Sequence, residues 1–556
     1  MSQDLMHYQL LYIQRLQKLQ EALKSKQYDA PPALGAFQQS MVQVGMKFWA
    51  NVWENPNHML DAHQRYLEML RSPSVNDNNY KRYFKSDFWQ SDPYFKWLKD
   101  VYIKTSEWMI ETIEEEALGF DEEERKKLLF LTRQIIEGMN PRNFPLTNPD
   151  ILKEALETKG ENFLRGLDNL IKDVKRGSVS MTDDKAFTPG ENVANTPGHV
   201  IYQNKMMELL YYPANADKAY KEPLVIIPPW INKYYILDLT PENSFIKWLT
   251  EQGHHVFCIS WANPDESYRD VEFKDYMHHG ALKSIEIANT MAGTDKANVV
   301  GYCIGGTLLA MTQAWLEGKK KKSPIQSATF LTTLLNFEKA GDLRVFIDKD
   351  QIQSLNQTLM RTGVMDGKSL SMTFSLLRAS DLIWSFVINN YFMGKDPVPF
   401  DLLYWNSDST NLPAAMHCDY LKSMYLDNLL PLKEYKLDGV KIDLSKIKTP
   451  AYFLSTQDDH IAPWEATKDG AALLGGETTF VLGGSGHIAG VINPPHKNKY
   501  GFEADGKRHD GSWWPHWQDW IQKKNNNPDK NNCKPLKNKN YTPISHAPGT
   551  YVLKKI

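Results

Sequence analysis

The sequence predicts a mostly helical N-terminal domain followed by an α/β domain with a largely parallel sheet. Three observations support this prediction. From about residue 200, short apolar runs alternate with helical patterns, as expected for strands joined by crossover helices. Strand-like β-branched runs are nearly absent before about residue 175. The pentapeptide Gly301-Tyr302-Cys303-Ile304-Gly305 stands between an apolar run and a helical stretch, which is the pattern of a tight strand-to-helix turn.

The helical N-terminal domain is predicted to span residues 1–185. Its long mixtures of polar and apolar residues are interrupted by helix breakers, such as Asp29-Ala30-Pro31-Pro32 and Asn140-Pro141. A stretch rich in Gly, Ser, Thr, Asn and Pro, roughly 177–198, predicts the linker into the second domain. The length of 556 residues also exceeds what one compact core usually holds.

The second domain, residues 186–556, supplies the predicted sheet. Its candidate strands are six short apolar runs: Leu224–Ile227, His255–Ser260, Asn298–Cys303, Ile325–Thr332, Ala451–Ser455 and Thr478–Leu482. Between the fourth and fifth runs, residues 336–449 do not follow the strand–helix alternation and are rich in Met, Phe, Tyr, Trp and Leu. We interpret this segment as a cap inserted over the active site; the alternative is a pair of extra crossover helices.

The pentapeptide at 301–305 predicts the nucleophile elbow of an α/β-hydrolase fold. Its flanking glycines allow a close backbone approach, and its central residue takes a strained conformation. The centre of this motif is usually serine, whereas this chain has Cys303. Cys303 is therefore the predicted nucleophile.

The fold requires an acid and then a histidine after later strands, in that chain order. Asp458 and Asp459 both follow the strand at 451–455, and we favour Asp459. His487 ends the glycine-rich turn after the strand at 478–482. A thiolate is the reactive form of cysteine and a minority at neutral pH, so we assign His487 to accept the thiol proton.

Two backbone N–H groups should stabilise the tetrahedral oxyanion. One belongs to Ile304, the residue after the nucleophile. The other should come from the loop 228–232, whose first two residues are prolines without an N–H. Trp230, Ile231 or Asn232 must then supply it, and we take Ile231 as the candidate. The predicted substrate-binding residues are Trp230, Asn232 and Tyr235, in or just after the loop 228–232, and His460, which directly follows Asp459.

A cysteine nucleophile favours acyl transfer from thioesters such as acyl-CoA over simple ester hydrolysis. Moving an acyl group between two thiols is nearly isoenergetic, so the acyl-cysteine keeps the reactivity of a thioester. It can then pass downhill to an alcohol and give an ester. A dry, capped pocket would keep water from the acyl group.

Composition excludes several other functions. The net charge of −3 gives no electrostatic basis for nucleic-acid binding. The 15 histidines form no metal-ligand spacing, so we expect no metal. We see neither a signal-peptide pattern nor an apolar run near the roughly 18–20 residues of a transmembrane span. The four cysteines are far apart, and we expect a cytoplasmic protein with reduced thiols.

The assembled motifs resemble those of the class I polyhydroxyalkanoate synthases. The match runs from about residue 190 onward, and the first 170 or so residues match loosely. At Trp230 the chain departs from the family pattern, where relatives have a smaller residue. The motifs that carry the resemblance include Pro228–Leu239, Ser260–Asp265, Gly301–Gly306, Thr333–Phe337, Pro397–Asn406, Asp459–Trp464, Gly486–Pro495 and Gly511–Pro515.

The resemblance implies polymerisation of (R)-3-hydroxyacyl-CoA, and of 3-hydroxybutyryl-CoA in particular, into a polyester with release of CoA. No separate cofactor is implied, because coenzyme A is part of the substrate. The family's nucleophile, acid and histidine correspond to Cys303, Asp459 and His487. Asp459 would either orient His487 or help to activate the substrate hydroxyl. The resemblance also implies a homodimer at the surface of cytoplasmic polyester granules, with phasins as neighbours.

Two other functions are compatible with parts of this pattern. A cysteine hydrolase similar to the dienelactone hydrolases also carries a Gly-x-Cys-x-Gly elbow, but those enzymes are compact single domains. The helical N-terminal region and the long insert therefore disfavour it. A catalytically silent granule-binding scaffold would use the aromatic content for adhesion, but it would have no need of Cys303, Asp459 and His487.

Overall fold

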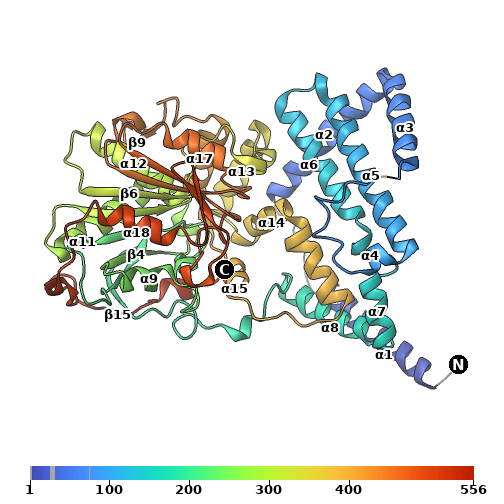
Figure 1. Cartoon of the computed structure of the whole chain (residues 1–556), viewed down its shortest axis with the longest axis horizontal. Coiled ribbons are helices and arrows are strands. Elements are labelled where there is room, and N and C mark those ends of the chain that lie inside the picture. Colours follow the sequence, from blue (N-terminus) through green and yellow to red (C-terminus); the bar gives the residue numbers. More distant parts are fainter. Residues whose placement is uncertain (1–2, 25–31, 74) are drawn as a thin grey trace. The chain divides into compact units, whose positions relative to one another are not determined.

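The computed structural model describes residues 3–24, 32–73 and 75–556. The chain forms two compact units (Figure 1). The first comprises residues up to 183 together with 372–399, and the second comprises 184–371 and 400–556. Residues 372–399, which lie inside the predicted cap segment, thus group with the helical unit. Among the described residues, no helix combines the length and apolar content that a membrane span requires.

The first unit is helical, as predicted. Asp92 caps one of its helices by accepting the N–H groups of Tyr94 and Phe95, and Pro93 fills the first helical position. The predicted break at Asp29-Ala30-Pro31 lies outside the described residues. The helices are α1 (Gln3–Lys24), α2 (Pro32–Glu54), α3 (Pro56–Arg71), α4 (Phe88–Ser91), α5 (Pro93–Glu116), α6 (Glu122–Met139), α7 (Pro149–Glu157) and α8 (Glu161–Arg176).

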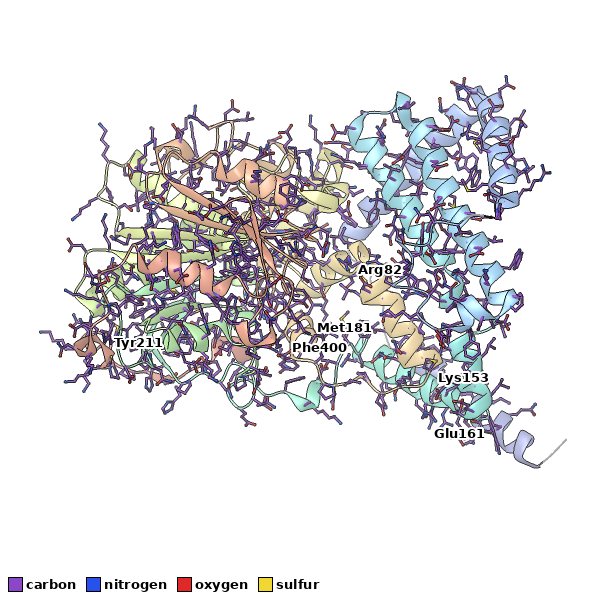
Figure 2. The ribbon with its side chains drawn as sticks, in the orientation of Figure 1. Arg82, Lys153, Glu161, Met181, Tyr211 and Phe400 are labelled. Carbon is purple, nitrogen blue, oxygen red and sulfur yellow. The ribbon has the colours of Figure 1, made fainter. Side chains whose placement is uncertain are left out.

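The late segment 372–399 packs closely on α8. A Cβ atom on Gly166 would lie 1.8 Å from the carbonyl oxygen of Tyr391, so only glycine permits this approach. The Asn162 amide donates to the carbonyl of Phe392 at 2.7 Å, and the Tyr391 hydroxyl donates to Asp173 at 2.8 Å. Figure 2 labels Glu161, where α8 begins, and Lys153 on α7 near it. The segment is therefore an integral part of the helical unit.

The second unit is built on an eleven-stranded sheet with the order β14-β13-β12-β11-β6-β5-β3-β4-β2-β1-β15. Neighbours from β4 through β3, β5, β6 and β11 to β12 are parallel, and β2 runs antiparallel to β4. The strands are β1 (His199–Gln203), β2 (Met207–Tyr212), β3 (Leu224–Ile227), β4 (Val256–Trp261), β5 (Ala297–Tyr302), β6 (Ile325–Leu331), β11 (Ala451–Thr456), β12 (Thr478–Gly483), β13 (Phe502–Ala504), β14 (Lys507–His509) and β15 (Ser545–His546).

The six predicted strands correspond to β3, β4, β5, β6, β11 and β12, each to within one residue at either end. The prediction omitted β1, β2 and the short edge strands. Two further pairs, β7 (Val364–Met365) with β8 (Leu412–Pro413) and β9 (Lys436–Leu437) with β10 (Val440–Lys441), lie outside the main sheet.

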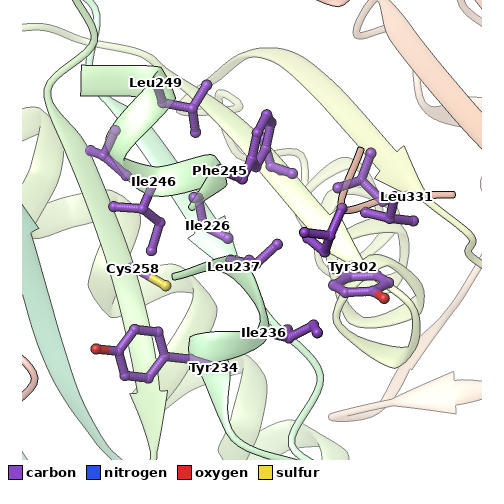
Figure 3. Close-up of a cluster of buried hydrophobic side chains, with 14 of the residues drawn as sticks. Ile226, Tyr234, Ile236, Leu237, Phe245, Ile246, Leu249, Cys258, Tyr302 and Leu331 are labelled. Atoms are coloured by element: carbon purple, nitrogen blue, oxygen red, sulfur yellow. The ribbon is translucent and has the colours of Figure 1, made fainter. Parts of the chain in front are cut away.

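Helices cover this sheet and complete its core. Alternate residues of the strands, such as Ile226, Cys258 and Tyr302, join one buried cluster with Phe245 of α9 and Trp517 of α18. Figure 3 shows part of this cluster, where α9 lies above the strands. The helices of the unit are α9 (Phe245–Glu251), α10 (Phe273–Asp275), α11 (Lys283–Ala292), α12 (Ile304–Gly318), α13 (Lys349–Thr362), α15 (Asp401–Ser407), α16 (Ala414–Asp419), α17 (Trp464–Ala471) and α18 (Trp514–Gln522), and α14 (Gly367–Leu377) leads into the helical unit.

The topology positions the candidate site. The carboxyl ends of parallel strands meet at the same edge of a sheet, which is where ligands bind in open α/β folds. Cys303 directly follows β5, Asp459 follows β11, and His487 follows β12. The three side chains therefore converge on one edge although they are up to 184 positions apart in sequence.

Candidate active site

The turn after β5 holds Cys303 in a strained conformation. Its φ is 53° and its ψ is −124°, which is rare for a residue with a side chain. The Cys303 N–H donates to the carbonyl of Leu331 at 2.9 Å, which fixes the turn against β6. A Cβ atom on Gly305 would lie 2.1 Å from the carbonyl oxygen of Ile227, so only glycine lets α12 start so close to β3. The turn leaves the thiol half-buried at the N-terminus of α12.

His487 and Asp459 form a short, buried pair. The Nδ1 atom of His487 lies 2.6 Å from Oδ2 of Asp459, whose side chain is fully buried. The other carboxylate oxygen accepts the N–H groups of Ile461 and Ala462 at 2.9 and 2.8 Å. The adjacent Asp458 is exposed. The structure thus brings His487 together with Asp459, the carboxylate that we favoured.

The surroundings of His487 favour its protonated form. Burial lowers the pKa of His487, but the charge and hydrogen bond of Asp459 and a hydrogen bond with Cys303 outweigh it and raise the pKa to about 10. Cys303 is close enough to His487 to influence its pKa, and Asp459 is hydrogen-bonded to the same ring. This is the arrangement expected of an activated nucleophile, and the roles of the three residues stay predictions.

The predicted oxyanion donors lie beside the thiol turn. Ile304 is the first residue of α12, so its N–H has no partner within that helix. If Gly305 had a Cβ atom, that atom would lie 2.1 Å from the carbonyl oxygen of Ile227 and 2.9 Å from that of Pro228. The start of the loop 228–232 therefore lies against the first turn of α12. The roles of Ile304 and of the half-buried Ile231 stay predictions.

The predicted substrate-binding residues are placed as follows. Trp230 is buried and stacks on Tyr276, with ring centroids 4.2 Å apart. The Tyr235 hydroxyl donates to Asp408 at 2.8 Å, and the Asn232 amide donates to the carbonyl of Trp405 at 3.2 Å. His460 follows Asp459 directly in the loop after β11. Their part in substrate binding stays a prediction.

Two buried tyrosines near Cys303 were absent from the sequence prediction. Burial raises the pKa of Tyr420 and of Tyr425, and the nearby Cys303 charge contributes to both shifts. Their rings pack against Phe337, with centroids 5.9 and 5.0 Å away. Tyr420 also begins a π-helical turn, Tyr420–Leu426, a feature that is frequent at functional sites. The only signal in the sequence was the aromatic content of residues 336–449.

Family models match two overlapping parts of the chain. The model described as the N-terminus of poly-beta-hydroxybutyrate polymerase (PhaC) matches residues 80–249. The model described as the alpha/beta hydrolase fold matches residues 222–494. The second match, together with the sheet order, confirms the predicted fold.

Curated relatives resemble nearly the whole chain. Poly(3-hydroxyalkanoate) polymerase subunit PhaC of Rhizobium meliloti (strain 1021) is 42% identical over 527 residues, which cover 90% of this chain and 85% of the relative. Poly(3-hydroxyalkanoate) polymerase of Methylorubrum extorquens is 43% identical, with 93% and 87% covered. Poly(3-hydroxyalkanoate) polymerase subunit PhaC of Cupriavidus necator is 38% identical, with 92% and 91% covered.

Proposed function

Because the chain belongs to the poly(3-hydroxyalkanoate) polymerase family, we propose that it polymerises (R)-3-hydroxyacyl-CoA into a polyester. The substrate that we propose for testing this activity is 3-hydroxybutyryl-CoA. In this proposal Cys303 carries the acyl group as a thioester and CoA is released. Enzymes of this family are acyltransferases. The observation that carries the proposal is that Cys303, in its strained turn after β5, and the buried His487–Asp459 pair meet at the same edge of the sheet, where Cys303 influences the pKa of His487.

The first step loads the enzyme. The Cys303 thiolate attacks the thioester carbonyl carbon, and the carbonyl oxygen becomes an oxyanion that the N–H groups of Ile304 and Ile231 would stabilise. Collapse of this intermediate breaks the carbon–sulfur bond to CoA. The departing thiolate takes the proton from the His487 imidazolium, so CoA leaves as a thiol.

The second step forms the ester. Neutral His487 accepts the proton of a 3-hydroxyl group on another hydroxyacyl unit, and the resulting oxygen attacks the acyl-Cys303 carbonyl. An ester bond forms, the bond to Cys303 breaks, and the Cys303 thiolate and the His487 imidazolium are regenerated. Each ester formed therefore consumes one thioester.

We assign Asp459 to the orientation of His487 rather than to activation of the substrate hydroxyl. Both of its oxygens are engaged, one by His487 and the other by two backbone N–H groups. A carboxylate whose side chain is fully buried is also poorly placed to reach a substrate.

The finer features of the proposal come from the family. We propose a homodimer that acts in the cytoplasm at the surface of polyester granules, with phasins as neighbours and no separate cofactor. The segment 336–449 would cover the pocket, although residues 372–399 of it belong to the helical unit. Light scattering of the purified chain, and its co-sedimentation with polyester granules, test the first two points.

The decisive experiment is Cys303→Ala with 3-hydroxybutyryl-CoA. We expect loss of CoA release and of insoluble polymer, with an unchanged circular dichroism spectrum. Cys418→Ala is the matched control, since Cys418 is another free, part-buried cysteine, and it should stay within about twofold of the original rate. Polymer formation by Cys303→Ala would refute the proposal. Release of free 3-hydroxybutyric acid by the unmodified enzyme, without polymer, would instead indicate a hydrolase.

A further inference from the structure

A buried lysine lies directly after the loop that is predicted to complete the oxyanion hole. Lys233 is only 5% exposed. Its Nζ atom lies 2.7 Å from Oδ1 of Asp408 and donates to the carbonyl oxygen of Val552 at 2.6 Å. We call Lys233, Asp408 and the Val552 carbonyl the clamp. A buried ammonium group is costly unless it is paired and hydrogen-bonded, and the clamp supplies both.

The clamp is tied to the loop through further hydrogen bonds. The Trp405 indole donates to the carbonyl of Lys233 at 2.7 Å, and the Asn232 amide donates to the carbonyl of Trp405 at 3.2 Å. The Thr410 hydroxyl donates to the carbonyl of Trp230 at 2.7 Å. The residues on both sides of Ile231 are thus fixed by the segment 405–410.

The third member of the clamp comes from the segment 544–556, here called the tail. The Glu208 carboxylate, which is buried on β2, accepts the N–H groups of Thr550 and Tyr551 at 2.9 and 3.0 Å. The Asn263 amide donates to the carbonyl of Lys554 at 3.1 Å. These anchors on either side of Val552 hold its carbonyl at a fixed place beside Lys233.

The mechanism does not otherwise use this buried charge. Burial lowers the pKa of Lys233, whereas the Asp408 carboxylate opposes that shift. The hydrogen bonds of the Lys233 ammonium run to the tail and to Asp408. Its position therefore suits a role in holding the loop.

We propose that Lys233 is a positioning residue for the oxyanion hole, and that the tail acts through it by presenting the Val552 carbonyl. The proposal rests on the proposed function, because it presupposes an acyl-transfer step with an oxyanion near Ile231. Loss of the clamp lets residues 230–232 shift. The oxyanion then loses a donor, while the Cys303–His487 pair stays intact.

Two reactions of the same thiol separate this role from a general structural one. Acylation by 3-hydroxybutyryl-CoA develops an oxyanion, whereas alkylation of Cys303 by iodoacetamide displaces iodide and develops none in that place. Alkylation therefore reports the thiolate and His487, and the first turnover of CoA release reports the oxyanion hole as well.

The test uses Lys233→Met, which keeps the length of the side chain without its charge, and a chain that ends at Tyr551, which lacks the Val552 carbonyl. We expect single-turnover CoA release to fall about 10- to 100-fold in both. This is less than the roughly 10²- to 10³-fold cost of removing an oxyanion donor, because the donor is displaced and not removed. The rate of Cys303 alkylation should stay within about twofold. Lys554→Met is the matched control, because its exposed side chain pairs with Asp265 and should leave both rates unchanged.

Two results would overturn the proposal: CoA release within twofold of the original rate in both variants, or alkylation that falls in parallel with CoA release. The second result would mean that Lys233 stabilises the fold in general and does not position the oxyanion hole. Failure of both variants to fold would lead to the same conclusion. Neither result bears on the proposed function, which is tested separately by polymer formation in Cys303→Ala and by the product that the unmodified enzyme releases.

Discussion

The second unit buries two ion pairs that differ in kind. We call Cys303, His487 and Asp459 the proposed catalytic cluster. In it, His487 pairs with Asp459, and the half-buried Cys303 has a strained backbone. In the clamp, the Lys233 ammonium pairs with Asp408 and also donates to the backbone carbonyl of Val552. The neighbours raise the pKa of His487, whereas burial lowers that of Lys233. A buried ion pair alone is therefore weak evidence for a catalytic site, and the strained, part-exposed Cys303 is the feature that distinguishes the first pair from the second.

The sharpest test of this difference is Asp459→Asn. The neutral amide removes the charge that holds the proton on His487, while burial still lowers the pKa. We expect CoA release to fall about 10³- to 10⁴-fold, as for a comparable loss of the orienting acid in other triads. The NMR titration of His487 should move from about pH 10 to well below it. Asp458→Asn, an exposed neighbour, should leave both unchanged, and equal losses in the two variants would contradict the assignment.

In the clamp, the corresponding change is Asp408→Asn. It leaves the Lys233 ammonium buried without its carboxylate, so we expect the free energy of unfolding to fall by about 3 kcal/mol. Urea unfolding followed by tryptophan fluorescence measures this loss. The exposed pair Asp265–Lys554 provides the control, since Asp265→Asn should cost less than about 1 kcal/mol. A smaller loss in Asp408→Asn than in Asp265→Asn would show that the clamp is not a stabilising element.

The His487–Asp459 pair should also make the stability of the protein depend on pH. The folded pKa of His487 is raised from 6.5 to about 10, so its stabilising contribution is fully present below about pH 6.5 and is lost as the pH rises through 10. Thermal midpoints should therefore drop by on the order of 5 °C between pH 7 and pH 10.5 from this group. The drop should be missing in Asp459→Asn. An equal drop in both proteins would exclude His487 as its source.

The smallest effect is expected from Tyr425→Phe, beside the proposed catalytic cluster. The ring and its contacts with Phe337 remain, and only one hydroxyl is lost. We expect CoA release to change by about fivefold or less, the equivalent of one ordinary hydrogen bond. Phe337→Tyr, which adds a hydroxyl on the same wall, serves as the matched change. A loss above 100-fold in Tyr425→Phe would instead place that hydroxyl in the chemistry.

The positions of Cys303, Asp459 and His487 at one edge of the sheet could be predicted from the sequence, whereas the clamp could not. Cys303, Asp459 and His487 each follow a strand whose apolar residues are contiguous, so local patterns locate them and the parallel sheet brings them together. Lys233 and Val552 are 319 positions apart, and no local pattern joins them. A lysine in a loop is ordinarily solvent-exposed, and its burial depends on the tail.

The fold shows the same division. The six central strands are short apolar runs and were predicted to within one residue. β2 carries the buried Glu208, which weakens its apolar pattern, and β15 is only two residues long. The assignment of 372–399 to the helical unit depends on contacts with α8, such as that of Gly166 with Tyr391, which the sequence does not encode locally.

That chain path bears on how the protein is made. A ribosome releases α8 long before it releases Tyr391, and β1 to β6 are synthesised in between. The surface of α8 around Gly166 therefore stays uncovered until the segment 372–399 is synthesised, after much of the second unit has left the ribosome. The first unit therefore cannot be completed before most of the second unit has been synthesised. A nascent chain stalled before residue 372 would expose that surface of α8 to chaperones.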